Sequence, residues 1–155
     1  MPSVYKLLLP ERADNTLPGS QIPLYLLILV AALGTVRSFI HMLAPDGGAG
    51  SIAGMDLSTP AADGIVFAFA LWGSAQLVYA ILQWVVVLRY RSLVPLFWLV
   101  QLLETALRML APRLKPAAFA HTPPGAYQNY LYLTLAVLML ALSLWSSRRQ
   151  AVETA

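Results

Sequence analysis

Four long apolar segments constrain the fold of this chain more than any other feature of its sequence. They cover about residues 22–43, 61–88, 93–111 and 126–145. A helix of about 20 apolar residues crosses the ~30 Å hydrocarbon core of a bilayer, and each segment is close to that length or longer. Only 11% of the 155 residues are charged, whereas a soluble domain carries about 25%. We therefore predict an all-α protein that forms an integral membrane four-helix bundle.

Proline residues indicate where these helices begin and end. Pro23 and Pro95 fall in first turns, where the missing backbone N–H leaves no hydrogen bond unmade. Pro112 follows the third segment and is expected to stop that helix. The predicted parts are an N-terminal cytoplasmic or interfacial tail over residues 1–21, a transmembrane domain over 22–147, and a C-terminal tail over 148–155.

Lysine and arginine are distributed unequally between the two ends of the predicted bundle. An even number of spans places both termini and the turn at residues 89–91 on the same side of the membrane. That side carries Lys6, Arg12, Arg89, Arg91, Arg148 and Arg149, and the opposite side carries Arg113 and Lys115. Because cytoplasmic loops are enriched in lysine and arginine, we predict that both termini are cytoplasmic.

Composition and motifs exclude several classes of function. The chain has no cysteine, which rules out disulfides, thiolate metal sites and cysteine-ligated iron–sulfur clusters. Its basic residues lie at segment ends and form no patch, so nucleic-acid binding is not expected. It has no Walker loop, HExxH, GxSxG or dinucleotide fingerprint. No familiar catalytic motif therefore identifies an activity.

Two stripes of polar residues interrupt the apolar segments. Gly34, Arg37, Ser38 and His41 share one face of the first helix, and Gln101, Glu104, Thr105 and Arg108 repeat that spacing on the third. These two helices run in the same direction, and a rise of about 1.5 Å per residue places Arg37 and Glu104 at nearly equal depth. Gln76 on the second helix is expected to complete the cluster. The candidate site is therefore Arg37, His41, Gln76, Gln101, Glu104 and Arg108.

This cluster admits more than one interpretation. Ion pairs of Glu104 with Arg37 and with Arg108 would fix helix register, as polar groups do between membrane helices. Alternatively, the cluster lines a pocket that opens toward the outer leaflet. Glu104 would then be the proton acceptor or cation partner, Arg37 and Arg108 would hold an anionic or carbonyl head group, and His41 would tune protonation. A third possibility is that His41 ligates haem or chlorophyll.

Three short motifs occur together in this sequence. They are Gly34-x-x-Arg37-x-x-x-His41, the Pro45-Asp-Gly-Gly turn and Glu104-x-x-x-Arg108. Over about residues 24–112 the chain resembles the small bacterial DoxX-like membrane proteins. The resemblance implies a four-helix bundle in the bacterial cytoplasmic (inner) membrane, and some members of that group are small subunits of quinone-linked redox complexes. No resident cofactor is predicted, and a bound lipid or quinone is left open.

We carry three functional hypotheses forward from the sequence. The first is a non-catalytic subunit that packs within a larger membrane complex, which the resemblance suggests is quinone-linked. The second is a membrane-embedded enzyme or binding protein for a lipid- or quinone-like molecule, using the Arg/His/Glu cluster. The third is a small dimeric transporter with Glu104 as coupling residue. The expected partners are the lipid bilayer and other membrane proteins or a second copy of the chain.

Overall fold

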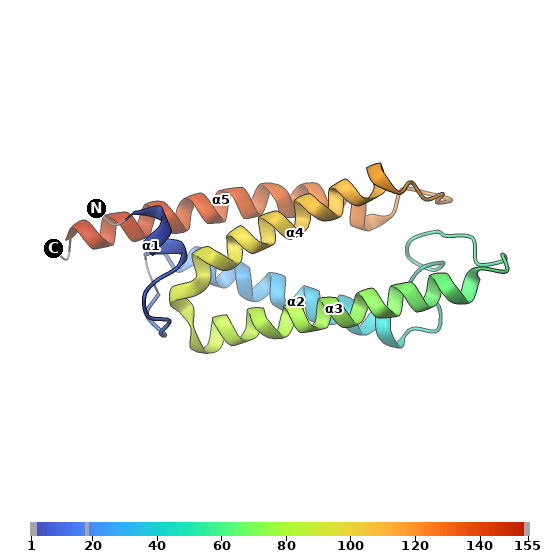
Figure 1. The fold of residues 1–155 in the computed structure, drawn as a ribbon, viewed down its shortest axis with the longest axis horizontal. Helices are drawn as coiled ribbons and strands as arrows, with labels where there is room; N and C mark the ends of the chain where they lie inside the picture. The colour runs from blue at the N-terminus through green and yellow to red at the C-terminus, as the bar shows by residue number, and fades with distance from the viewer. Residues whose placement is uncertain (1–2, 18, 154–155) are drawn as a thin grey trace.

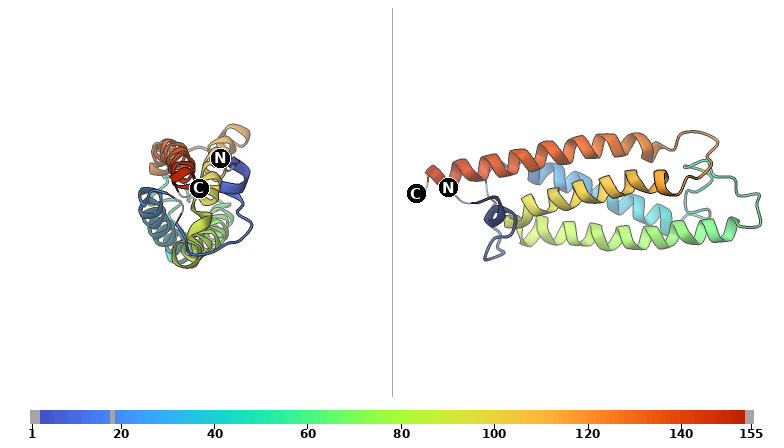
Figure 2. Two further views of the ribbon diagram at one scale, coloured as in Figure 1. Left: turned by 90° about the vertical axis from the view of Figure 1, so that its left-hand side faces the viewer. Right: turned by 45° about the horizontal axis from the view of Figure 1, so that its top comes forward.

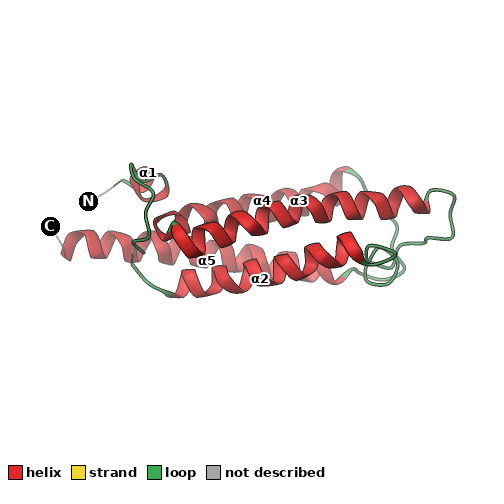
Figure 3. Cartoon of the chain, turned by 90° about the horizontal axis from the view of Figure 1, so that it is seen from below, coloured by secondary structure: helices red, strands yellow, loops and turns green. Residues whose placement is uncertain are grey.

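The structure, a computed structural model, describes residues 3–17 and 19–153, without the side chains of residues 148 and 150–153. It is all-helical, and the described residues form no strand (Figure 3). The elements in chain order are α1 (Val4–Leu8), α2 (Ile22–Leu43), α3 (Ala62–Arg89), the 3-10 turn η1 (Arg91–Leu93), α4 (Val94–Leu114) and α5 (Pro124–Glu153) (Figure 1).

Four of these helices are long and apolar enough to cross a membrane, namely α2, α3, α4 together with η1, and α5. Both chain termini and the α3–α4 turn lie at one end of the bundle, which we call the terminal end (Figure 1). The two long connections, residues 44–61 and 115–123, lie at the other end, which we call the loop end (Figure 2). The prediction of an all-α, multi-pass membrane protein with four spans is confirmed.

The helices associate mainly as two pairs, with α2 along α3 and α4 along α5. A cluster of buried apolar residues joins the pairs toward the terminal end: Leu24, Leu27, Val30, Val86, Val87, Val94, Trp98 and Ala136. Trp98 is completely buried, and its indole Nε1 donates a hydrogen bond to the Pro23 carbonyl at 3.0 Å. The terminal half of the bundle is therefore packed with apolar side chains.

Three predicted helix ends are wrong by two residues or more. The third span continues past Pro112 to Leu114. A proline in the last turn removes only one backbone hydrogen bond, and the helix still closes with Lys115 N donating to Ala111 O at 2.9 Å. The fourth span begins at Pro124 and continues to Glu153 instead of ending at 145. Its serines do not break the helix, since Ser146 Oγ donates to Leu142 O at 2.7 Å. The second span is shifted by only one residue, to 62–89.

The N-terminal segment is tied to the terminal end. Ser3 Oγ accepts from Lys6 N at 3.4 Å and caps the short helix α1. Asp14 N donates to Ser92 Oγ at 3.0 Å, and Ser92 N donates to Asp14 O at 3.2 Å. The segment predicted as a tail therefore packs against the α3–α4 turn. Residues 154–155 of the predicted C-terminal tail lie outside the described residues.

Candidate functional site

A cleft of about 470 Å³ lies near the loop end of the bundle. Side chains of all four spanning helices and of both long connections line it. Its polar and aromatic lining includes Arg37, His41, Phe69, Trp72, Arg108, Gln128 and Asn129, and its apolar lining includes Leu33, Val36, Ile40, Ile52 and Phe119. We call this space the loop-end cleft. Its size falls in the range of small-molecule sites, and its lining combines apolar walls with a few polar groups, as such sites do.

Arg37 projects from α2 into the cleft and has only neutral partners. Its Nε donates to His41 Nε2 at 3.2 Å, and its Nη1 donates to Gln128 Oε1 at 3.1 Å. The guanidinium carbon lies 4.9 Å from the centroid of the Trp72 ring. Across the described residues, no carboxylate forms an ion pair with Arg37. The cleft therefore contains a positive charge that the described chain does not neutralise.

His41 is held in one orientation by both of its ring nitrogens. Nδ1 lies 2.7 Å from the Gly47 carbonyl, and Nε2 accepts the Arg37 hydrogen bond. These partners assign the single proton to Nδ1 and make the imidazole neutral. The ring also stacks on Trp72 with centroids 4.9 Å apart, and it is 6% exposed. Neither nitrogen is therefore free to ligate haem or chlorophyll as the structure stands, and His41 positions Arg37.

Two glycines allow this arrangement. A Cβ on Gly73 of α3 would lie 2.7 Å from His41 Cβ, so only glycine lets α3 approach α2 this closely. Gly47 has a φ of +59°, in the left-handed region that side chains other than glycine rarely adopt. The Gly47 conformation turns its carbonyl toward His41. Glycine at positions 47 and 73 therefore allows His41 to occupy its observed place.

Glu104 belongs to a second group of polar residues that adjoins the cleft. Arg108 Nη2 donates to Glu104 Oε2 at 3.2 Å, one helical turn away on α4. Gln101 Nε2 donates to the same oxygen at 3.3 Å and to Thr105 Oγ1 at 3.1 Å. The predicted Glu104–Arg108 ion pair is present. The predicted Arg37–Glu104 ion pair is not found among the described residues, because Glu104 has its partner on its own helix and Arg37 extends toward α5.

The glutamine that joins this group from α3 is Gln83 and not Gln76. Gln83 is 1% exposed, and its Nε2 donates to Gln101 Oε1 at 3.2 Å. Gln76 Oε1 is buried and has no hydrogen-bond partner among the described residues. Gln83 lies six residues before the end of α3, and Gln101 lies seven residues after the start of α4. Because α3 and α4 are antiparallel, counting residues from the helix ends places Gln83 at the depth of Gln101. The sequence therefore contained the information needed to choose Gln83 over Gln76.

The structure brings three of the six predicted residues to the cleft wall: Arg37, His41 and Arg108. Gln101 and Glu104 are connected to the cleft through Arg108, and Gln76 is neither a lining residue of the cleft nor a hydrogen-bond partner, through its Oε1, of the described residues. Sequence reasoning missed Trp72, Gln128 and Asn129, which line the same cleft. Gln128 follows the start of α5 by four residues, close to the depth of Arg37, and an amide near a predicted helix start was the available signal.

Comparison with protein-family models, with curated proteins and with solved structures finds no match to this chain. The cleft lining contains two guanidinium groups and a neutral imidazole, and the one adjoining carboxylate, Glu104, is already paired with Arg108. The side chains at the cleft therefore carry an excess of one positive charge. This is the charge balance of a site for an anionic group bounded by apolar walls.

Proposed function

We propose that this multi-pass membrane protein binds an apolar molecule with an anionic head group in the loop-end cleft. The observation that carries the proposal is the unneutralised guanidinium of Arg37. Charge inside a membrane-spanning helix is costly and usually has a partner or a function. Arg37 donates two hydrogen bonds to neutral groups, and its Nη2 donates none to any described residue. A carboxylate or phosphate on a ligand supplies the missing countercharge.

Arg108 and the apolar lining support the same proposal. Arg108 faces the cleft beside Tyr132, with its guanidinium carbon 6.0 Å from the ring centroid, and its charge is shared with Glu104. Its Nε is buried without a hydrogen-bond partner in the described chain. The remaining walls are aliphatic, aromatic and proline side chains, which suit a hydrocarbon chain or ring system. A lipid- or quinone-like ligand with an acidic group fits both parts of the lining.

The test is the affinity for oleate of protein reconstituted in nanodiscs of zwitterionic lipid. Arg37→Gln removes the charge but keeps a polar side chain, and Arg89→Gln at the terminal end is the matched control. A hydrogen bond to a charged group contributes about 1.5–3 kcal/mol, so Arg37→Gln is expected to weaken binding roughly 10- to 100-fold. Arg89→Gln is expected to leave affinity unchanged. Equal affinities of wild type and Arg37→Gln would contradict the proposal.

Packing against other membrane proteins is a second proposal, supported by α3. Only 11% of the most apolar stretch of α3 is buried within the chain, whereas 22–28% of the corresponding stretch is buried in each of the other three spans. This uncovered apolar surface is consistent with a subunit role, including the quinone-linked assembly that the DoxX-like resemblance implies. Purification from native membranes, followed by mass spectrometry, tests it. A stoichiometric protein partner supports the subunit role, and a protein that purifies alone opposes it.

The direction of the chain in the membrane is also a proposal. The terminal end carries the excess of lysine and arginine, so the positive-inside rule supports cytoplasmic termini. The loop-end cleft would then face the outer leaflet of a bacterial cytoplasmic membrane. A reporter fused to each terminus tests this orientation. Transport coupled to Glu104 has less support, because that carboxylate is held by Arg108.

A further inference from the structure

We infer that the ligand of the loop-end cleft is an anionic amphiphile resident in the bilayer, which enters sideways between α2 and α5 from the membrane. The inference rests on the proposed function and adds to it the source of the ligand and its route. It excludes a water-soluble anion that arrives through the loop end.

The first connection covers the loop end of the cleft with a folded turn. Gly47, Gly48 and Ala49 are buried, and the turn is closed by backbone hydrogen bonds, including Ala53 N to Gly48 O at 2.9 Å. Asp46 accepts from the amides of Gly48 and Ser51 at 2.8 and 2.6 Å. The His41–Gly47 hydrogen bond fastens this turn to α2. Ordered backbone of this turn therefore covers part of the aqueous side of the cleft.

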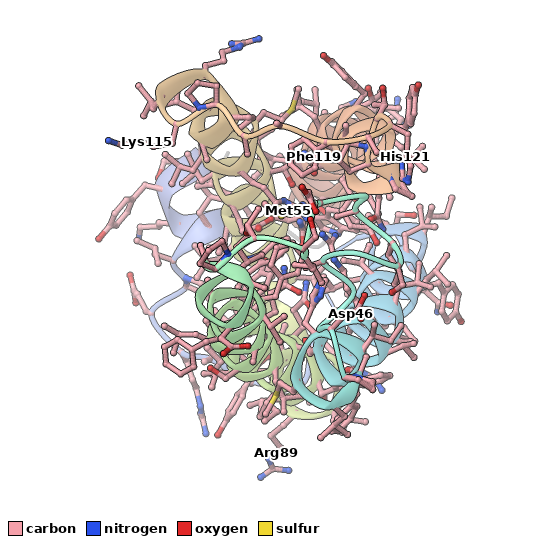
Figure 4. The ribbon with its side chains drawn as sticks, turned by 90° about the vertical axis from the view of Figure 1, so that its right-hand side faces the viewer. Asp46, Met55, Arg89, Lys115, Phe119 and His121 are labelled. Carbon is pink, nitrogen blue, oxygen red and sulfur yellow. The ribbon has the colours of Figure 1, made fainter. Side chains whose placement is uncertain are left out.

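The second connection meets the first above the cleft. Ala120 N donates to Gly54 O at 2.8 Å. The ring of His121 lies so close to Gly54 that a Cβ there would be 2.8 Å from its Nε2. Viewed from the loop end in Figure 4, the segment bearing Asp46 and Met55 crosses the bundle, with Phe119 and His121 beside it. The two connections are thus joined at Gly54 and Ala120, beside a second hollow of about 650 Å³ that lies between them.

In contrast to the partly covered loop end, the side of the cleft that faces lipid has an apolar and exposed rim. Leu33, Val36 and Ile40 line the cleft at i, i+3 and i+7 on α2 and are 46%, 59% and 37% exposed. In a membrane, this stripe faces acyl chains. Opposite it, Gly125 of α5 has no side chain to cover Arg37, and a Cβ there would lie 3.4 Å from Arg37 Nη2. A hydrocarbon chain can lie along the stripe while its head group reaches Arg37.

The depth of Arg37 agrees with this route. It lies six residues before the end of α2, which corresponds to roughly 9 Å at about 1.5 Å per residue. The Cα at this depth lies within the acyl region, and the long basic side chain extends toward the interface, where its Nε meets His41 one turn nearer the loop end. An anionic lipid head group at that level meets the guanidinium without crossing the hydrocarbon core.

The experiment narrows the lipid-facing rim without touching any charged residue. Val36→Trp fills the opening on α2, and Val78→Trp, at a position 60% exposed on α3 and outside the cleft, is the matched control. Oleate affinity is measured in nanodiscs of zwitterionic lipid, and butyrate serves as the water-soluble carboxylate. We expect Val36→Trp to weaken oleate binding at least tenfold and Val78→Trp to leave it unchanged. Wild type should bind butyrate at least 100-fold more weakly than oleate.

Two results would overturn the lateral route. One is oleate binding that depends on Arg37 but is unaffected by both Val36→Trp and a second rim variant, Ala126→Trp. The other is butyrate bound as tightly as oleate, which makes the ligand a water-soluble anion. In both cases the proposed anion site stands. Oleate binding that is indifferent to Arg37→Gln instead removes the proposed function and this inference together.

Discussion

The two halves of this bundle are built from the same four helices but have opposite interiors. Toward the terminal end, the helices meet through aliphatic side chains around the fully buried Trp98. Toward the loop end, the corresponding space contains Arg37, His41 and Arg108 around an open cleft. The buried amides Gln83 and Gln101 lie between the two halves, at the level where one interior gives way to the other.

The difference separates the part of the molecule that holds the helices together from the part for which we propose ligand binding. Lipid tails are as apolar as leucine, so close packing between membrane helices is what stabilises the apolar half. The polar half has an unneutralised charge, a cavity and three buried polar atoms without partners in the described chain, namely Gln76 Oε1, Arg108 Nε and Asn129 Oδ1; Ser143 Oγ is the one such atom described toward the terminal end. Buried polar groups in folded proteins are normally hydrogen-bonded, so each of these atoms needs an explanation such as a bound water or ion.

The largest expected effect on stability is in the apolar half. Trp98→Ala removes a fully buried side chain and its hydrogen bond to Pro23, and such truncations destabilise by about 3–5 kcal/mol. We expect about 3 kcal/mol by reversible unfolding in detergent. Oleate affinity of the fraction that stays folded should not change. The control is Trp145→Ala, at an exposed position, with an effect below about 0.5 kcal/mol. A selective loss of binding in Trp98→Ala would erase the distinction between the halves.

A smaller effect is expected where α2 and α3 meet beside the cleft. Gly73→Ala places a Cβ 2.7 Å from His41 Cβ and 3.1 Å from Ser38 O, and such overpacking typically costs about 1–3 kcal/mol. It should also weaken oleate binding, because His41 positions Arg37. Gly64→Ala on the same helix meets nothing within 4 Å and should stabilise by up to about 1 kcal/mol. We therefore expect Gly73→Ala to lower the free energy of unfolding and Gly64→Ala to raise it. Equal effects would show that the close approach at Gly73 is unimportant.

The amides at the boundary between the halves should have a modest effect. Gln83→Leu leaves Gln101 Oε1 with only the Tyr79 hydroxyl, at 3.4 Å. Hydrogen bonds between membrane helices contribute about 0.6 kcal/mol on average, so we expect a loss near that value. Gln76→Leu removes a buried oxygen that has no described partner, and we expect it to be neutral or stabilising. If Gln76→Leu is the more damaging variant, the assignment of the two glutamines is reversed.

The smallest expected effect is the pH dependence of the loop cover. Backbone hydrogen bonds from Ser51 and Gly48 lower the pKa of Asp46 from 3.8 to about 2. Because the folded pKa is depressed, the stabilisation is complete above pH 4 and is lost as the pH falls toward 2. The carboxylate is partly exposed, so we expect at most about 1 kcal/mol. Hydrogen exchange of the Gly48 and Ser51 amides should accelerate over this range, and Asp46→Asn should remove the pH dependence.

Much of the fold was predictable because membrane helices leave a simple signal. Length and hydropathy identified four spans, and α2 was predicted with the bounds that the structure has. Helix ends were less predictable, because Pro112 and Ser146 suggest breaks. A proline in a last turn and serines that donate back to helix carbonyls both let a helix continue. Local hydrogen bonding therefore decided where the helices end.

The candidate site was predictable where depth could be counted from helix ends. That argument placed Arg37 level with Glu104 and brought the two polar stripes, with His41 and Arg108, into one cluster, since α2 and α4 are parallel. It failed for the Arg37–Glu104 pair, because a carboxylate four residues before Arg108 pairs within its own helix. The loop cover was not predictable, since it depends on left-handed glycines such as Gly47 and on contacts between two segments without periodicity. Those are properties of tertiary structure.

The most direct test of the central claim is a comparison of two ligands that differ only in the head group. Oleate and oleyl alcohol carry the same chain, and their affinities for the wild-type protein are measured in nanodiscs of zwitterionic lipid. If Arg37 binds an anionic head group, oleate binds at least tenfold more tightly than oleyl alcohol, and Arg37→Gln abolishes this preference. Equal affinities for the two ligands would mean that the loop-end cleft recognises hydrocarbon alone, contradicting the claim that it is an anion site.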